Sequence, residues 1–197
     1  MLLASSIFRN AQNNETQPTT VNKSFRVVFG SCAHQDKEQP LLKNAVSLNP
    51  DLFIYLGDNI YGDTCDMNLL KTKYEKLASK TEFQELKKST KILSVFWDDH
   101  DYGENNKGRH PPFKKESKEI FMNFWEIPQD SDRRTHDGIY GSEFVKIGDK
   151  TLQIIMLDTR TFRDDLLKNE PKNPAYKNDY IPCTKKDSTI LGKRQWK

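Results

Sequence analysis

The 197-residue sequence lacks several features that would define its class. No run of apolar residues approaches the roughly 20 that a membrane-spanning helix needs, so we expect no membrane span. The three cysteines, Cys32, Cys65 and Cys183, are odd in number and therefore form no closed disulfide framework. Lysine and arginine total 31 against 28 acidic residues, and no basic run occurs, which argues against nucleic acid as a partner.

The beginning of the chain has little that indicates folded structure. Residues 1–8 are apolar, but they have no basic region before them and are short for the apolar part of an export signal. Residues 10–22 are polar and rich in threonine. We therefore predict that residues 1–23 are a disordered linker or the remnant of an export signal, and that residues 24–197 belong to one domain.

Strand-like and helix-like segments alternate along the rest of the chain. Residues 24–30, 51–56 and 91–97 are predicted strands, and residues 39–48, 67–78 and 82–88 have apolar side chains at helical spacing. This alternation indicates an α/β fold of mostly parallel strands with crossover helices. A helix at 114–125, a hairpin formed by residues 138–147 and 151–157, and a long irregular loop at 158–188 complete the prediction.

Polar residues with metal-ligand chemistry follow each predicted strand, where open α/β sheets bind their ligands. Asp58 comes directly after the second strand, where its carboxylate is placed to bridge two metal ions, and the phenolate of Tyr61 would suit Fe³⁺. The glycine and aspartate residues around them favour turns, so a simple turn explains this segment equally well. Cys32 follows the first strand and is either a thiolate ligand or a small buried apolar residue, whereas His34 is expected to be an ordinary loop histidine.

The segment Trp97-Asp98-Asp99-His100-Asp101 is the most informative of these groups. Three carboxylates and an imidazole in four positions would repel and perturb one another unless a cation lay among them. A solvated acidic loop is the alternative, but such a loop rarely follows a strand as apolar as this one, so we favour a metal site. Asp99 is the candidate ligand, and His100 is the candidate donor to a phosphoryl oxygen or to the leaving group.

Arg160 follows the last predicted strand, directly after Asp158 and Thr159. Its planar guanidinium could bind a substrate phosphate. It could equally be a structural partner for Asp158 or for a neighbouring carboxylate, and both readings remain open.

Four motifs occur in order: GSCAHQ at 30–35, LGDNIYGDT at 56–64, WDDHDYGENN at 97–106 and LDTRTFRD at 157–164. Together they resemble the PhoD-like alkaline phosphatases (alkaline phosphatase D), a family of the calcineurin-like metallophosphatases. The resemblance covers about residues 25–196. It implies a metallophosphatase-type α/β sandwich that hydrolyses phosphate mono- or diesters with Fe³⁺ and Ca²⁺, or with other divalent metals. It also implies an extracytoplasmic protein.

The resemblance implies specific roles for five residues. Cys32 and Tyr61 would bind iron, Asp58 would bridge the two metals, and Asp99 would bind the second metal. His100 would assist phosphate binding or protonate the leaving group.

Members of this family continue past the segment that corresponds to residues 189–196 into a second half of the sheet, which supplies further His and Asp ligands. We therefore expect that this chain is truncated before that half and that one metal position lacks part of its ligand set. Two alternatives stay open: an inactive fragment, and a Mg²⁺-dependent phosphotransferase with carboxylates at its strand ends. A small phosphoester is the expected partner, and the sequence does not indicate the oligomeric state.

Overall fold

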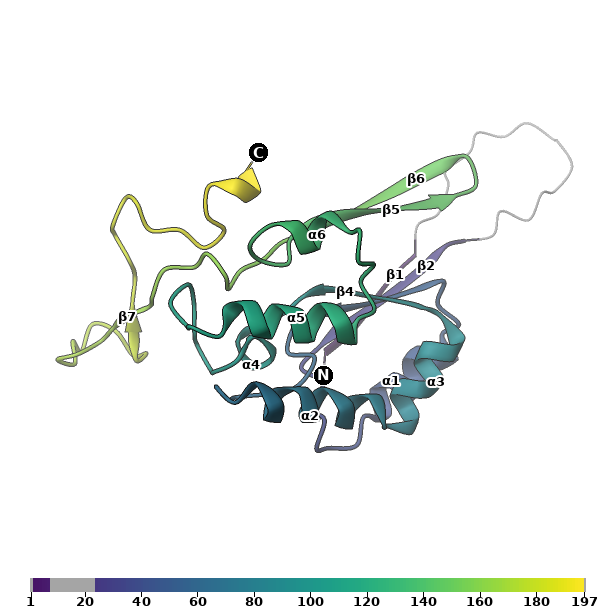
Figure 1. Ribbon diagram of the computed structural model, residues 1–197, viewed down its shortest axis with the longest axis horizontal. Helices are drawn as coiled ribbons and strands as arrows, with labels where there is room; N and C mark the ends of the chain where they lie inside the picture. Colours follow the sequence, from purple (N-terminus) through teal and green to yellow (C-terminus); the bar gives the residue numbers. More distant parts are fainter. Residues whose placement is uncertain (1, 8–23, 197) are drawn as a thin grey trace, which may run out of the picture.

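A four-stranded sheet forms the centre of the computed structural model, which describes residues 2–7 and 24–196 (Figure 1). Its strands are arranged in the order β1-β2-β3-β4. Strands β2, β3 and β4 are parallel, and β1 is antiparallel to β2. The predicted α/β class with mostly parallel strands is therefore confirmed. The strands span Leu2–Ile7 (β1), Arg26–Ser31 (β2), Leu52–Leu56 (β3) and Lys91–Phe96 (β4).

Strand β1 differs from the sequence prediction. It pairs with β2 from Leu2 opposite Ser31 to Ile7 opposite Arg26. The prediction of a disordered linker is therefore corrected for these six residues. The physical reason is that β2 would otherwise present an unpaired edge, and backbone pairing satisfies that edge without any strong side-chain pattern. Residues 1 and 8–23 of the predicted linker lie outside the described residues.

Four helices cover one face of the sheet. Helix α1 (Pro40–Ser47) connects β2 to β3, and α2 (Met67–Ala78) and α3 (Thr81–Ser89) connect β3 to β4. Helix α5 (Lys114–Phe124) follows β4. Because β2, β3 and β4 are neighbours in chain order, right-handed crossovers place all their helices on the same side. The core on this side is made of sheet residues and of apolar helix positions, among them Val28, Phe53, Tyr55, Leu42, Leu70, Leu86 and Phe121.

The opposite face of the sheet packs against the predicted hairpin, which is confirmed (Figure 1). Strands β5 (Gly141–Ile147) and β6 (Lys150–Met156) pair in antiparallel register. Successive side chains of β2 and β3 point to opposite faces of the sheet. Residues next in sequence to those of the first core therefore point toward the hairpin. This second, smaller core consists of Val27, Leu52, Ile54 and Met156, with partly buried residues such as Leu152 and Ile154.

The remaining elements are short. They are α4 (Asp99–Tyr102), α6 (Asp132–Thr135), the two-residue strands β7 (Leu167–Lys168) and β8 (Tyr180–Ile181), and a 3₁₀ turn at Arg194–Trp196. The β7–β8 pair lies inside the loop predicted to be irregular, where the buried Asn169 amide donates to the carbonyl oxygens of Tyr176 and Asn178. Side-chain bonds of this kind take the place of an apolar core and leave no periodic signal in the sequence. Among the described residues, no helix has the length and apolar character required to cross a bilayer.

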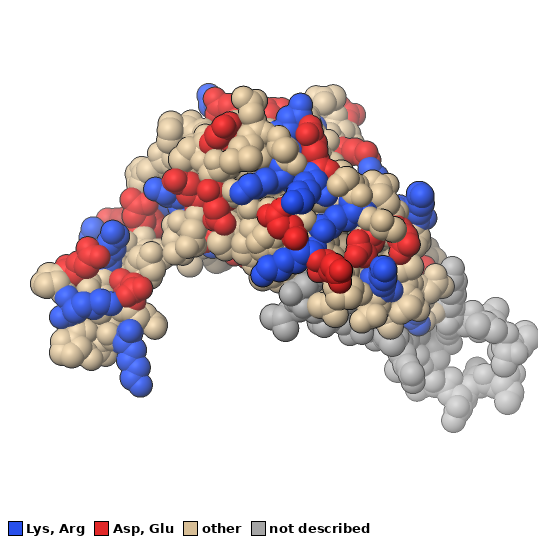
Figure 2. Space-filling model, turned by 90° about the horizontal axis from the view of Figure 1, so that it is seen from below, with Lys and Arg blue, Asp and Glu red and all other residues tan. Residues whose placement is uncertain are grey.

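Charges of both signs are mixed on the face of the molecule shown in Figure 2. Lysine and arginine side chains alternate there with aspartate and glutamate, and no large area carries one sign. This face therefore does not present the continuous basic surface that nucleic-acid backbones require.

Candidate metal centre

The loops that follow β2 and β3 lie side by side and are joined by backbone hydrogen bonds. The amide of Cys32 donates to the carbonyl oxygen of Gly57 at 3.3 Å, and that of Ala33 donates to the carbonyl oxygen of Asp58 at 2.8 Å. Both Cys32 and Asp58 have a left-handed backbone, with φ of 61° and 48°. This conformation is uncommon outside glycine and is concentrated at functional sites.

Two glycines allow the loop after β3 to approach the loop after β4. A Cβ added at Gly57, whose φ is 94°, would lie 3.1 Å from the backbone nitrogen of Asp98. A Cβ added at Gly62 would lie 2.6 Å from the carbonyl oxygen of His100. The Gly62 amide donates to that same oxygen at 2.9 Å. The loops after β3 and β4 are therefore in direct backbone contact.

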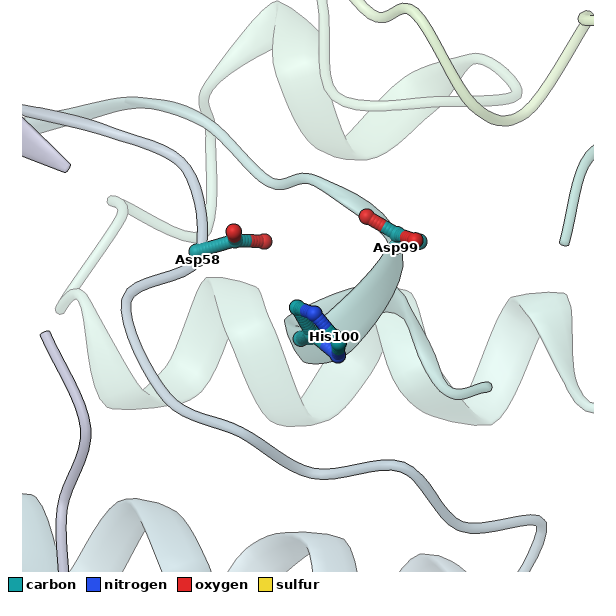
Figure 3. Close-up of side chains that lie close together, drawn as sticks. All are labelled: Asp58, Asp99 and His100. Atoms are coloured by element: carbon teal, nitrogen blue, oxygen red, sulfur yellow. The ribbon is translucent and has the colours of Figure 1, made fainter. Parts of the chain in front are cut away.

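This approach brings Asp58, Asp99 and His100 together (Figure 3). One possible ligand atom from each residue lies within 4.8 Å of the others, as in a metal site. Asp99 is buried, and the Oδ1 atom of Asp58 is buried with no hydrogen-bond partner among the described residues. Burial and the nearby carboxylate of Asp98 raise the pKa of Asp58. A cation among these groups would satisfy the unpaired oxygen and offset the repulsion between the carboxylates.

Asp101 connects the two loops that carry Asp58 and Asp99, a role that the sequence analysis did not identify. Its side chain is fully buried, and burial raises its pKa well above the ordinary value. Its carboxylate accepts the backbone amide of Asn59 at 3.2 Å and that of Asp98 at 2.5 Å. The second of these bonds belongs to a capping box at the start of α4. Asp101 therefore joins the loop of Asp58 to that of Asp99. The D-x-x-D spacing of Asp98 and Asp101, which is typical of a capping box, was the sequence signal that could have identified this residue.

The rings of His34, Tyr61 and His100 form a continuous stack. Tyr61 lies between the two histidines, with ring centroids 4.6 Å from His34 and 4.3 Å from His100. Burial raises the pKa of Tyr61, and hydrogen bonding to Cys32 raises it further. His34, expected to be an ordinary loop residue, is therefore part of the site's wall.

His100 is oriented by a carboxylate. Its Nδ1 lies 2.6 Å from Oδ1 of Asp63. Burial lowers the pKa of His100, but the hydrogen bond with Asp63 and the charges of Asp58 and Asp99 outweigh this effect, so its pKa is raised. Because Asp63 engages Nδ1, the Nε2 atom is the nitrogen left for a substrate.

Arg160 makes the contacts expected of a structural partner for neighbouring carboxylates. Its Nε donates to Asp98, and its Nη2 donates to Asp99 Oδ1 at 3.1 Å. The other oxygen of Asp99 accepts the backbone amide of Asn106 at 2.6 Å. The guanidinium therefore neutralises the carboxylates at the end of β4, and the assignment of Arg160 to a substrate phosphate stays a prediction.

All six residues that the sequence singled out lie in this one region. Cys32 Sγ lies 3.5 Å from Asp58 Oδ2 and completes the connection between the strand ends. The others are Asp58, Tyr61, Asp99, His100 and Arg160, whose contacts are described above. Their proximity is established, whereas their roles as ligands and catalysts stay predictions.

Comparisons with known proteins give one result that bears on the fold. No protein-family model matches the chain, and no curated protein matches it. A solved structure of PhoD is similar to it, with a TM-score of 0.60 over 87% of this chain and 16% sequence identity. The similarity covers 40% of the PhoD chain, so this chain spans well under half of that protein. At this identity the comparison shows that the chain shares the fold of part of PhoD.

Proposed function

We propose that this chain carries part of a metal centre that hydrolyses phosphate mono- or diesters. One observation carries the proposal: the buried Asp58 Oδ1 has no hydrogen-bond partner among the described residues and lies beside Asp99 and His100. A buried carboxylate oxygen without a partner is costly, and a cation is the partner that this group of ligands fits. The fold shared with PhoD supports a phosphatase of this type.

The donor set supports two cations rather than one. We propose that Cys32 and Tyr61 bind iron, that Asp58 bridges, and that Asp99 binds a second metal such as Ca²⁺. Thiolate and phenolate suit a transition metal, and carboxylates suit a hard divalent ion. The 3.5 Å separation of Cys32 Sγ and Asp58 Oδ2 is consistent with two ligands of one ion.

The residues of the chain would orient the ester and move one proton. Bound cations would supply a nucleophilic hydroxide and stabilise charge on the phosphoryl oxygens. His100, held through Nδ1 by Asp63, would donate a proton from Nε2 to the leaving oxygen. Arg160, beside Asp98 and Asp99, would keep the carboxylates in place and add positive charge near the phosphate.

The test combines metal analysis with hydrolysis assays on a chromogenic phosphomonoester and a chromogenic phosphodiester. We expect iron in the purified protein, a visible tyrosinate-to-iron absorption, and hydrolysis of at least one ester in the presence of Ca²⁺. Asp58→Asn should lower both metal content and hydrolysis, the latter by roughly a hundredfold or more, because it removes a negative ligand. Asp130→Asn, an exposed position outside the site, is the matched control.

Other results would select among the alternatives. Full hydrolysis by Asp58→Asn would refute the bridging role. Metal binding without hydrolysis of either ester would favour the inactive fragment. Magnesium alone in the protein, with phosphoryl transfer to an acceptor other than water, would favour the phosphotransferase.

A further inference from the structure

Gln35 joins the loop after β2 to the main chain of Tyr61. Its Oε1 accepts the backbone amide of Tyr61 at 2.7 Å, and its Nε2 donates to the carbonyl oxygen of Tyr61 at 3.1 Å and to Asp36 Oδ2 at 3.0 Å. A backbone amide only donates and a carbonyl only accepts, so these bonds fix the orientation of the side-chain amide. Gln35 is fully buried and is the last residue of the GSCAHQ motif, where the sequence assigned it no role.

The acceptor oxygen of Gln35 is the part of this contact that no neighbour duplicates among the described residues. The carbonyl oxygen of Tyr61 has a second donor, since Lys73 Nζ lies 3.2 Å from it and 2.6 Å from the carbonyl oxygen of Gly62. The amide of Tyr61 donates to Gln35 Oε1. Loss of that oxygen would leave the amide without its acceptor, which is costly in a part-buried loop.

The direction of the Tyr61 backbone decides where its phenol lies. The phenol shares a hydrogen bond with Cys32, and the ring is stacked between His34 and His100 at centroid distances of 4.6 and 4.3 Å. The phenol oxygen is the atom of Tyr61 farthest from the main chain, so a rotation of the backbone displaces it more than any other atom. Groups in a functional site must be held to within about 0.5 Å and 10–20°. Control of the Tyr61 backbone is therefore control of its contact with Cys32.

We propose that Gln35 is the positioning residue of Tyr61, and that its acceptor oxygen holds the phenol beside Cys32, where iron would bind. The proposal rests on the proposed function where it concerns iron, whereas the placement of the ring is a property of the protein alone. Gln35 itself contacts neither metal nor substrate. Without its acceptor, the Tyr61 amide would turn toward another partner, and the phenol would move away from Cys32.

The four histidines of the sequence make the position of the Tyr61 ring measurable without metal. Protons that lie over the face of an aromatic ring are shifted upfield in a proton NMR spectrum, and the rings of His34 and His100 both stack on Tyr61. His110 and His136 provide reference signals, and the ring contact of His136 is with a different residue. Spectra of the metal-free protein are recorded at a pH at which all four imidazoles are neutral. Tyr61→Leu identifies the two signals that the Tyr61 ring shifts.

Variants of Gln35 test the acceptor directly. Gln35→Met has a similar length but no acceptor, so the two shifted signals should move toward their positions in Tyr61→Leu. Iron added to this variant should no longer give the tyrosinate-to-iron absorption. Gln35→Glu keeps an acceptor oxygen, and Lys73 still donates to the Tyr61 carbonyl, so both measurements should match the unmodified protein. Gln153→Met, at an exposed position on the β5–β6 hairpin, is the matched control and should change neither.

Thermal unfolding of each variant verifies that it is folded. Gln35→Asn, whose amide is one methylene short of Tyr61, gives the same test if Gln35→Met does not fold, and it should displace the same two signals.

The outcomes distinguish this proposal from the proposed function. Unchanged histidine signals in the folded Gln35→Met or Gln35→Asn variant, or signals that stay displaced in Gln35→Glu, would overturn the role of the acceptor oxygen. An iron absorption of full intensity in Gln35→Met would overturn it as well and leave the proposed metal centre intact. Displaced signals, together with no iron absorption in the unmodified protein, would support the role of Gln35 and refute iron binding by Tyr61.

Discussion

Replacing Asp158 with asparagine tests the hydrogen-bond network that joins the hairpin to the sheet. Asp158 follows β6, and its side chain is fully buried. Oδ1 accepts Trp97 Nε1 at 3.1 Å and the backbone amides of Arg160 and Thr161 at 2.9 and 2.8 Å. Oδ2 accepts the Ile139 amide at 2.9 Å and the Thr161 hydroxyl at 2.6 Å. Both oxygens therefore act only as acceptors.

An asparagine at this position must turn an NH₂ group toward one of these two sets of donors. The less costly choice places it at Oδ2, because the Thr161 hydroxyl can rotate to accept while the Ile139 amide loses its partner. One buried amide without an acceptor costs about 1–3 kcal/mol. For a chain of this size, each kcal/mol lowers the melting temperature by roughly 2–4 °C, so we expect a decrease of about 2–12 °C.

The measurement is thermal unfolding of Asp158→Asn followed by circular dichroism. Asp149→Asn, at the exposed turn between β5 and β6, is the control that makes the same chemical change without burial. A melting temperature for Asp158→Asn that matches the control would show that the carboxylate is not required, and the reasoning from donor and acceptor counts would be refuted.

Two further predictions concern the site. Asp101→Ala removes the acceptor of the buried Asn59 amide and of the part-buried Asp98 amide. It should lower the free energy of unfolding by about 1–3 kcal/mol for the buried amide alone, which denaturant titration measures. It should also weaken metal binding as the loops separate, which calorimetry with Ca²⁺ measures. Unchanged stability would contradict the clamping role of Asp101. Removing metal with a chelator should lower the melting temperature, since a cation at a hundred times its Kd stabilises the folded state by about 2.7 kcal/mol. Asp58→Asn should be insensitive to the chelator, and equal sensitivity would place the metal elsewhere.

The helices and the parallel strands were predictable because their apolar residues are local and periodic. Residues 67–78, predicted as a helix from spacing alone, coincide with α2, and the predicted hairpin coincides with β5 and β6 within a few residues. The carboxyl ends of parallel strands lie at one edge, so the meeting of Cys32, Asp58 and Asp99 also followed from the order of the strands.

What the sequence could not predict depends on contacts between distant segments. Strand β1 is held by backbone pairing to β2, which requires no particular side chains. Asp101 accepts a hydrogen bond from the Asn59 amide of another loop, and although its D-x-x-D spacing indicates a helix cap, neither spacing nor composition reveals that its carboxylate is buried. For Arg160 the sequence left two anionic partners open, a substrate phosphate and a carboxylate, and the contacts of its guanidinium with Asp98 and Asp99 depend on the packing of distant segments.

The left-handed backbone at Cys32 and Asp58 is held by contacts within the protein. A left-handed conformation at a non-glycine residue costs on the order of 1–3 kcal/mol and persists only where the surroundings hold it. Here the surroundings include the bonds from Cys32 to Gly57 and from Ala33 to Asp58, which join the loops after β2 and β3. In the proposed metal centre these bonds would keep the side chains of Cys32 and Asp58 near each other, and the ion bound there would be selected by the chemistry of its donors.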